Sequence, residues 1–192
     1  MADVQGMARI LARAFYEDAV WKWFMPDDAT RADRLERVFA TFTRSVYLRH
    51  GSDCYTTDAY EGAAIWAPPG HGHMSAGDIL RIGPAWVKAI GWRDLLRAKR
   101  GVDSFENVHP REEHYYLPFV GVAPELQGRG LGTALIRPVL EKCDRERIPA
   151  YLEATSVDSR RCYERIGFQT LSEEVLAGDG PPFFPMWRNP AT

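Results

Sequence analysis

Hydrophobic residues in the first third of the chain recur at the spacing of amphipathic helices. Apolar side chains return every three or four positions within residues 4–16 and again within residues 30–49, which predicts two helices that each bury one face. Between these helices, residues 21–26 are too aromatic for an ordinary solvent-exposed loop. Two short segments at 53–57 and 62–67 flank a turn-prone stretch and predict a pair of strands.

The rest of the chain alternates strand-like and helix-like segments. Residues 71–113 form a long connection with helical spacing at 76–90 and 92–99, and a mostly apolar strand at 113–122 follows it. Its evenly apolar character predicts burial on both faces. The remaining predicted elements are a helix ending near residue 147, a strand at 150–155, a helix at 159–167 and strands at 169–176 and 183–188. This order predicts an α/β (α+β) protein with a single domain over residues 1–192.

Composition and charge narrow the function classes. The chain has 192 residues and a formal net charge of −2, which gives no reason to expect a nucleic-acid partner. No segment approaches the roughly 20 apolar residues that cross a bilayer, and the amino end lacks the features of a signal peptide. The 3 cysteines are an odd number without metal-ligand spacing. We therefore expect reduced thiols in a cytoplasmic protein, with no metal and no membrane.

A glycine-rich run connects the strand at 113–122 to the helix that follows. Gly128, Gly130 and Gly132 stand at every second position, where a backbone free of Cβ atoms can turn tightly and approach a ligand. The helix that starts there directs unpaired N–H groups and the positive end of its dipole into the turn, which predicts a phosphate site. A Walker loop would require Gly-Lys-Ser or Gly-Lys-Thr, and a dinucleotide fingerprint would require glycine in place of Thr133; neither is present.

The glycine-rich run is part of a longer sequence motif. Gln127 to Gly132 follows the pattern Gln-x-x-Gly-x-Gly after Val-x-Pro at 122–124, and this resembles motif A of the GNAT superfamily of acyl-CoA-dependent N-acetyltransferases. Downstream, the segment from Tyr163 to Phe168 resembles the second signature of that family, with Ser159 where asparagine is usual. Within the family, the motifs are most similar to the subgroup of puromycin N-acetyltransferase. Fold and cofactor carry over with such a resemblance, but the substrate does not.

The resemblance covers nearly the whole chain and implies a specific architecture. It implies the GNAT fold, with a mixed central sheet, a splayed pair of parallel strands and flanking helices. Family members usually have a first strand before the first helix, but here only two residues precede residue 3, where that helix begins. We therefore expect the first edge strand to be absent or truncated. Dimers are common among relatives, so a homodimer is one expectation for the assembly.

The resemblance also implies a cofactor site for acetyl-CoA, the co-substrate. Main-chain groups of Val120 and Val122 would hold the pantetheine arm, and Arg129 would add charge at the rim of the pyrophosphate site. Ser159 would take the place of the usual asparagine contact. The N–H groups that would hold the pyrophosphate are those of Gln127, Gly128, Arg129, Gly130, Leu131, Gly132 and Thr133.

Direct acetyl transfer needs an acid for the departing thiolate and a neutral amine. By the family pattern, Tyr163 is the acid, since a phenol can donate a proton late in the reaction. The base is open: Tyr116 occupies one position where the family places a base, and His114, two residues earlier, would share its face. Glu153 is another candidate, and many amines need no dedicated base. A covalent route through Cys162 is disfavoured, because an unactivated helix cysteine usually only packs.

The acceptor is expected to be a small cationic amine with an apolar or aromatic body, since aromatic walls with a few carboxylates suit such a ligand. The residues that suggest it are Trp21, Trp23, Phe24, Trp66, Trp86 and Trp92, with Glu17, Asp18, Asp27 and Asp28. The same tryptophans could instead pack the core. Two other functions stay open: transfer to a protein amine, and an acyl-CoA-binding sensor or interaction protein without catalysis.

Overall fold

A computed structural model describes residues 3–92 and 94–191 of the chain. Its helices are α1 (Val4–Ala14), α2 (Ala19–Phe24), α3 (Asp28–Ser45), α4 (Ala76–Ile90), α5 (Leu95–Val108), α6 (Leu131–Glu146) and α7 (Val157–Glu164), with short 3₁₀ helices η1 (Tyr47–His50), η2 (Pro124–Leu126) and η3 (Leu176–Gly178). Its strands are β1 (Asp53–Thr56), β2 (Gly62–Ala67), β3 (Tyr115–Val122), β4 (Ala150–Ala154), β5 (Gln169–Thr170), β6 (Glu174–Val175) and β7 (Pro182–Arg188). None of the described helices is long and apolar enough to cross a membrane.

The strands form one mixed sheet. Their order is β1-β2-β3-β4-β7-β5, and β6 pairs with β7. The pair β3–β4 is parallel, whereas β1–β2, β2–β3 and β4–β7 are antiparallel. Within the described residues no strand precedes α1. The predicted architecture, a mixed sheet with one parallel pair and flanking helices, is therefore confirmed.

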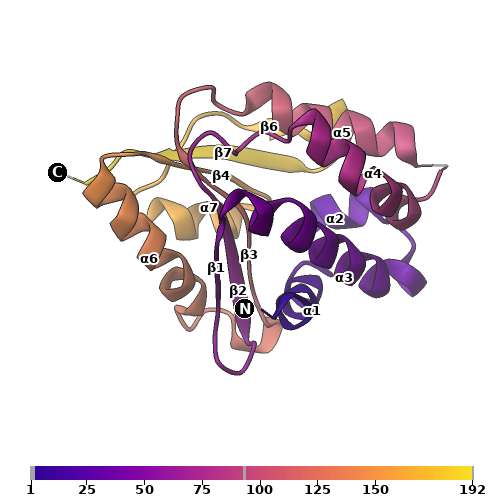
Figure 1. The fold of residues 1–192 in the computed structure, drawn as a ribbon, viewed down its shortest axis with the longest axis horizontal. Coiled ribbons are helices and arrows are strands. Elements are labelled where there is room, and N and C mark those ends of the chain that lie inside the picture. Colours follow the sequence, from indigo (N-terminus) through magenta and orange to yellow (C-terminus); the bar gives the residue numbers. More distant parts are fainter. Residues whose placement is uncertain (1–2, 93, 192) are drawn as a thin grey trace.

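The parallel pair splays apart after two residues. β3 and β4 are paired only at Tyr115–Ala150 and Tyr116–Tyr151, although both strands continue well beyond these positions. The register between β2 and β3 shifts at this level, which marks a β-bulge near Pro118. A bulge bends and twists its strand, and a proline donates no ladder hydrogen bond. The bulge thus turns β3 away from β4, and in Figure 1 the ribbons of β1 to β3 run steeply across those of β4 and β7.

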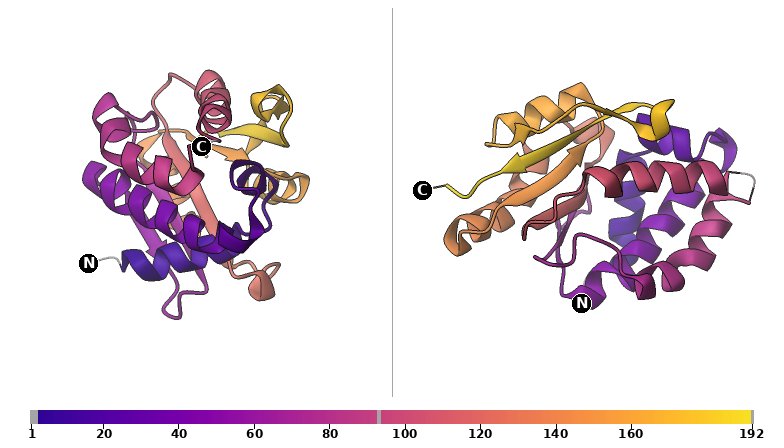
Figure 2. Two further views of the ribbon diagram at one scale, coloured as in Figure 1. Left: turned by 90° about the vertical axis from the view of Figure 1, so that its right-hand side faces the viewer. Right: turned by 90° about the horizontal axis from the view of Figure 1, so that it is seen from above.

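Helices cover both faces of the sheet and bury two apolar clusters (Figure 2). Side chains of α1, α2 and α3 pack with Ile65 on one face, and side chains of α6 pack with Trp66 on the other. β2 is buried along its whole length because its alternating side chains enter both clusters. Full burial of a leucine, isoleucine or phenylalanine contributes about 1.5–3 kcal/mol, so these clusters hold the two halves of the splayed sheet in place.

The structure corrects four predicted boundaries. Residues 21–26, expected as an aromatic connection, belong largely to α2, which starts earlier because Asp18 accepts hydrogen bonds from the N–H groups of Val20 and Trp21. The second helix ends at Ser45, and a 3₁₀ turn completes the predicted span.

The other two differences lie later in the chain. The stretch expected at 92–99 is the start of a longer helix, α5, and residue 93 lies outside the described residues. The strand expected at 169–176 is divided into β5 and β6, which pair with β7 in separate places. Six-residue helices and two-residue strands are too short to give a clear hydrophobic period.

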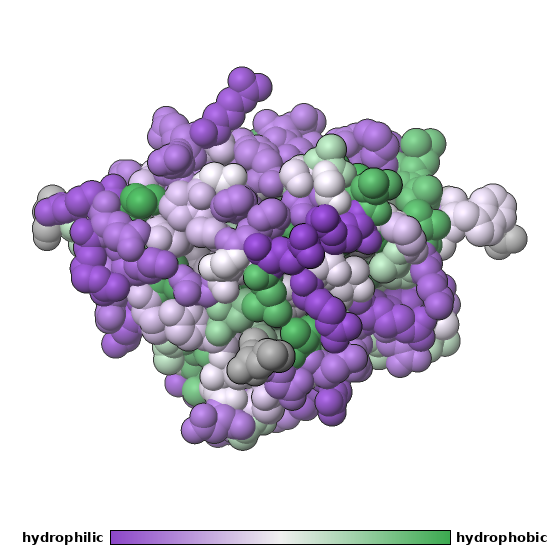
Figure 3. Space-filling model, in the orientation of Figure 1, coloured by the Kyte–Doolittle hydropathy of each residue, from purple (hydrophilic) through white to green (hydrophobic). Residues whose placement is uncertain are grey.

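Most of the surface in Figure 3 is hydrophilic, but hydrophobic residues gather over α4 and α5. Exposed apolar side chains there are Ile79, Leu80, Val87, Leu95 and Leu96. Since single exposed apolar side chains are common on soluble domains, no partner follows from this surface alone.

Helix α1 lies unusually close to β3. A Cβ atom on Gly121 would come within 2.6 Å of the Cβ of Ala14. We therefore expect Gly121→Ala to lower the free energy of unfolding by about 1–3 kcal/mol, the usual effect of overpacking. Adding Ala14→Gly should restore part of the loss, because it removes the atom in the way. Urea unfolding of the two single variants and the double variant measures this coupling, and strictly additive effects would show that the close approach is not the cause.

Candidate functional site

A cleft of about 580 Å³ opens where β3 and β4 separate. Its walls are the end of β3, the loop before α6 and the inner face of α7. Of the residues predicted from the sequence to bind the cofactor or act in catalysis, those that line it are Val120, Val122, Gln127, Gly128, Gly130, Leu131, Gly132, Thr133, Ser159 and Tyr163. Arg129 belongs to the same loop and is exposed, but it does not line the cleft. Folding thus brings the two sequence motifs together across one opening.

The loop before α6 has main-chain N–H groups without a capping side chain. Gly128 and Gly130 have φ angles of 76° and 81°, and no atom lies within 4 Å of the place where a Cβ would stand on either one. Gly130 is also the N-cap of α6, and it offers no side chain to cap the first-turn N–H groups. These groups and the helix dipole therefore remain free to bind a negatively charged ligand in the cleft.

The edge of β3 that faces the cleft carries free main-chain groups. The N–H of Ala123 donates to the carbonyl of Glu61 on the β2 side, at 2.8 Å. Because main-chain groups alternate along a strand, those of Val120 and Val122 point the other way, towards the cleft. The carbonyl of Val122 accepts from Nε2 of Gln127 at 3.1 Å, so that side chain steadies the loop against the strand. The remaining groups can pair with an extended ligand in the manner of an added strand.

Helix α7 presents Tyr163 to the cleft. Ser156 and Ser159 form a reciprocal capping box at its start, so the Ser159 hydroxyl is used within the helix end, where it donates to the carbonyl of Ser156 at 2.9 Å. The Tyr163 ring packs against Phe168, with 5.8 Å between the ring centroids. Burial, and the neighbouring Cys162 thiol, raise the pKa of Tyr163 above its usual value. The phenol therefore stays protonated at neutral pH and holds a proton that it can donate.

A second cavity, of about 220 Å³, adjoins the cleft. Its walls are mainly aromatic: Trp21, Phe24, Phe42, Tyr47, Trp86, Phe105, Tyr116 and Phe119. It shares Val120, Thr155 and Tyr163 with the cleft. The two cavities therefore meet beside the Tyr163 side chain.

A buried carboxylate lies in the second cavity. The side chain of Glu153 is 5% exposed, and its Oε2 accepts a hydrogen bond of 2.9 Å from the hydroxyl of Tyr116. Its Oε1 is buried without a hydrogen bond, and Nδ1 of His109 lies 3.5 Å away. Burial, together with the negative charge of Glu153, raises the pKa of Tyr116 well above its usual value. A buried carboxylate oxygen without a partner favours a cationic ligand.

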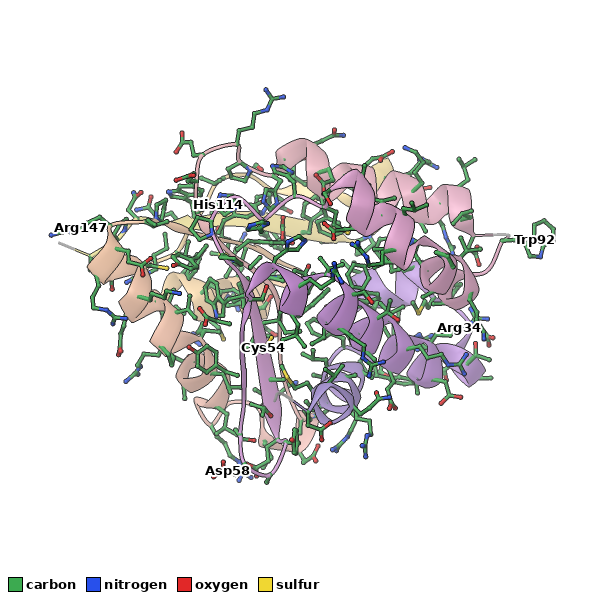
Figure 4. The ribbon with its side chains drawn as sticks, in the orientation of Figure 1. Arg34, Cys54, Asp58, Trp92, His114 and Arg147 are labelled. Carbon is green, nitrogen blue, oxygen red and sulfur yellow. The ribbon has the colours of Figure 1, made fainter. Side chains whose placement is uncertain are left out.

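The aromatic residues singled out in the sequence divide between this cavity and other places. Trp21, Phe24 and Trp86 line the cavity. Trp66 is fully buried on the other face of the sheet, in the cluster formed with α6. Trp23 is half-buried beneath the Arg97 guanidinium, and Trp92 is 77% exposed and projects from the end of the molecule in Figure 4.

The carboxylates predicted beside the acceptor mostly lie elsewhere. Glu17 pairs with Lys22 at the surface, Asp27 caps α3, and Asp28 bonds to Tyr16 and Arg31. Asp18 caps α2 and accepts a hydrogen bond of 2.5 Å from Thr155 at the end of β4; burial raises its pKa. Glu153 takes the predicted place instead. The strand pattern at 150–155 located this residue, but only the splay of the sheet opens its side chain to a cavity.

His114 does not lie at the cleft. It directly precedes β3, at the end of the strand opposite the glycine loop, and it lines neither cavity. Figure 4 shows it at the top of the molecule, whereas the loop before α6 lies at the bottom of Figure 1. Its ring is 4% exposed, and burial lowers its pKa to about 4. Its ring lies 6.5 Å from that of Tyr116 between centroids, but it packs among His109, Tyr151 and Trp187 and reaches neither cavity.

Among residues 3–92 and 94–191, no group of three or more His, Cys, Asp and Glu side chains is arranged to hold a metal ion.

Comparison with known proteins agrees with this geometry. Residues 89–168 match the acetyltransferase (GNAT) family. An uncharacterised N-acetyltransferase of Schizosaccharomyces pombe is 27% identical over 99% of this chain and 81% of its own length. The 5-NmdU N-acetyltransferase of Pseudomonas phage PaMx11 is 35% identical over 50% of this chain and 70% of its own length.

A solved structure from Corynebacterium glutamicum, described as histone acetyltransferase HPA2 and related acetyltransferase, superposes with a TM-score of 0.70. It is 23% identical and covers all of this chain and 93% of its own, so it shows the shared fold. The chain therefore belongs to the GNAT acetyltransferase family, whose members use acetyl-CoA as co-substrate.

Proposed function

We propose that this protein is an N-acetyltransferase that moves the acetyl group of acetyl-CoA directly to the primary amine of a small molecule. The observation that carries the proposal is the junction of two cavities beside Tyr163. One has the main-chain groups for a phosphate-bearing, extended ligand, and the other has aromatic walls and a buried carboxylate. Direct transfer requires that both substrates meet beside one proton donor, and Tyr163 stands at the place where the two cavities meet.

The cleft fits coenzyme A by the chemistry of its donor set. The first-turn N–H groups of α6, with the positive-φ glycines Gly128 and Gly130, would hold the pyrophosphate. The open edge of β3 at Val120 and Val122 would pair with the pantetheine arm. Ser159 is used as a helix cap, so its contribution would come through the position of α7 rather than through a contact of its own.

The second cavity fits an amine that is cationic and has an apolar or aromatic body. Indole and phenyl faces attract such cations, and Glu153 supplies the opposite charge at the polar end. During transfer the amine nitrogen forms a bond to the acetyl carbon as the C–S bond breaks. A primary ammonium loses one proton before the attack and a second one after it, and keeps one N–H in the amide. The departing thiolate takes a proton from Tyr163, which regains one from the second proton of the nitrogen, so that one proton in total goes to solvent. The acetyl group ends on the nitrogen, and free coenzyme A is released.

The alternatives are less well supported. A protein amine would need an open groove for a peptide, whereas about 220 Å³ between aromatic walls suits a small molecule. The phage relative is named a 5-NmdU N-acetyltransferase, and this name supports an acceptor other than a protein. A sensor without catalysis would have no need for a protonated phenol between two cavities. The puromycin-type subgroup, the single domain, the homodimer and the cytoplasmic location stay predictions from the sequence.

The test is release of free thiol from acetyl-CoA in the presence of a panel of amines. The panel contains arylalkylamines such as 2-phenylethylamine, aliphatic amines of similar length, and short peptides with a free amino terminus. We expect the arylalkylamines to give the highest kcat/KM and the peptides to give little turnover, because the cavity is small and aromatic. Peptides as the best acceptors would support the protein-amine function, and acetyl-CoA binding without turnover on any amine would support the sensor.

A further inference from the structure

Three buried side chains, those of Glu153, His109 and His114, lead from the second cavity towards the start of β3. Oε1 of Glu153 lies 3.5 Å from Nδ1 of His109, and Nε2 of His109 lies 3.1 Å from Nε2 of His114. Nδ1 of His114 lies 2.6 Å from the carbonyl oxygen of Glu112. The side chains of Glu153 and His109 are 5% and 4% exposed. The chain Glu153–His109–His114 is therefore continuous and almost free of solvent.

The hydrogen-bond partners fix where the protons lie. A carbonyl oxygen only accepts, so Nδ1 of His114 must carry a proton and donate it to Glu112. The pKa of His114 is lowered to about 4 by burial, so its ring is neutral and its Nε2 can only accept. The nitrogen that faces it, Nε2 of His109, must then be the donor. In the neutral form of His109, this leaves Nδ1 without a proton and directed at Glu153, so this nitrogen is the one that can accept a proton.

The surroundings keep the two histidine rings in this orientation. The His109 ring packs against Tyr116 and Tyr151, with centroid distances of 4.7 and 4.8 Å. Gly72 covers the contact between the rings, and a Cβ atom there would come within 2.5 Å of Nε2 of His109. No larger residue fits without moving the ring, so the loop at Gly72 and the tyrosines exclude water from the pair.

We propose that the Glu153–His109 pair takes the proton from the cationic amine, and that His114 is a positioning residue that keeps Nδ1 of His109 directed at Glu153. This inference rests on the proposed function. The ammonium N–H bond breaks, and its proton passes to Oε1 of Glu153 and on to Nδ1 of His109, directly or through one water. The amine keeps the electron pair of that bond and can attack. After transfer the proton leaves His109 for solvent, which restores the pair.

Other ionisable groups face this pair and share its electrostatics. Tyr116 donates to Glu153, and the His73 ring lies 4.4 Å from that of His109 between centroids. Nδ1 of His73 is 2.8 Å from Glu106, at the exposed side of the cavity. His73 and Glu106 therefore offer the proton a route to solvent. The hydrogen bond from His114 to the carbonyl of Glu112 cannot pass a proton on, so it only orients the rings.

The experiment compares two acceptors of nearly the same shape. 2-Phenylethylamine is an ammonium ion at pH 7, whereas O-benzylhydroxylamine is neutral and needs no base. In His109→Gln we expect kcat/KM to fall about a hundredfold for the first amine and less than about threefold for the second. His114→Phe removes the acceptor for His109 and should give the same selective loss, about tenfold. His114→Gln keeps an acceptor and should recover part of it.

The control is His71→Gln. His71 is exposed, stacks on His50 and lines neither cavity, so both amines should be acetylated as by the unchanged protein. Acetyl-CoA affinity should stay constant in all four variants. Equal losses for the two amines in His109→Gln, or no loss, would overturn the inference and leave the proposed transferase in place.

A spectroscopic measurement on the unsubstituted protein tests the proton positions without any turnover. In neutral imidazole the protonated and bare nitrogens have well-separated ¹⁵N chemical shifts. We expect His114 to show a protonated Nδ1 and a bare Nε2 at pH 7. The opposite tautomer would remove the positioning role, whether or not any amine is acetylated and whether or not the variants fold.

Discussion

Replacing Tyr163 with phenylalanine is expected to lower kcat by about a hundredfold, the usual contribution of a general acid, and to leave acetyl-CoA affinity unchanged. The ring packs on Phe168 and stays in place, so the substitution removes only the hydroxyl. Burial raises the pKa of this hydroxyl, which keeps its proton available until the thiolate departs. Thiol release gives kcat, and calorimetric titration with acetyl-CoA gives the affinity.

The matched control for this substitution is Tyr55→Phe. Tyr55 is a half-buried tyrosine on β1 that lines neither cavity, so its loss of one hydroxyl should not change kcat. Unchanged kcat in Tyr163→Phe would mean that Tyr163 only packs between α7 and the sheet. Weakened acetyl-CoA binding together with low kcat would point to a displaced helix rather than a lost proton donor.

The second large effect is expected in the glycine loop. Gly130 has a φ of 81° at the N-cap of α6, and an alanine in the left-handed region is strained by about 1–2 kcal/mol. Relief of this strain would rotate the first-turn N–H groups away from the pyrophosphate. We expect Gly130→Ala to weaken acetyl-CoA binding tenfold or more, since each 1.4 kcal/mol changes affinity by about a factor of ten. Titration with acetyl-CoA measures the effect.

Two comparisons separate phosphate binding from general strain. Gly70→Ala introduces alanine at a φ of 80° in open space, far from the cleft, so it should affect stability without changing affinity. S-acetylpantetheine lacks the pyrophosphate, and its binding should be nearly the same in Gly130→Ala and the unchanged protein. Equal weakening of both ligands would show that the loop does not act through phosphate.

The glycine loop could be predicted because it is local. All the residues from Gln127 to Thr133 are contiguous, and the strand before them and the helix after them follow from short-range hydrophobic periodicity. A turn between two such elements has only a few conformations, so its glycines predict an anion site without knowledge of the rest of the fold. The pairing of motif A with Tyr163 came from the resemblance, and the sheet explains it, because β3 and β4 are neighbours.

The second cavity, which we propose for the acceptor, could not be predicted from the sequence, because its walls come from segments that are distant in the chain. Phe42 on α3 and Phe105 on α5 line the same cavity only once the helices pack over the sheet. Trp66 and Ile65 are adjacent in sequence, yet they enter opposite faces. A strand sends alternate side chains to opposite sides, and the sequence does not say which side holds the cavity.

The sequence alone predicted most of the helices and strands in their order, although not α2, together with the glycine-rich turn and the resemblance to the GNAT family, because these depend on residues close together in the chain. Tertiary structure alone decided which charged groups line the second cavity. The bulge near Pro118 separates β3 from β4 and opens a cavity on Glu153. His114, which directly precedes β3, is buried beside His109 and lines neither cavity. Both outcomes depend on long-range packing. Local sequence preferences do not determine the direction in which these side chains point, whereas the packing of distant segments does.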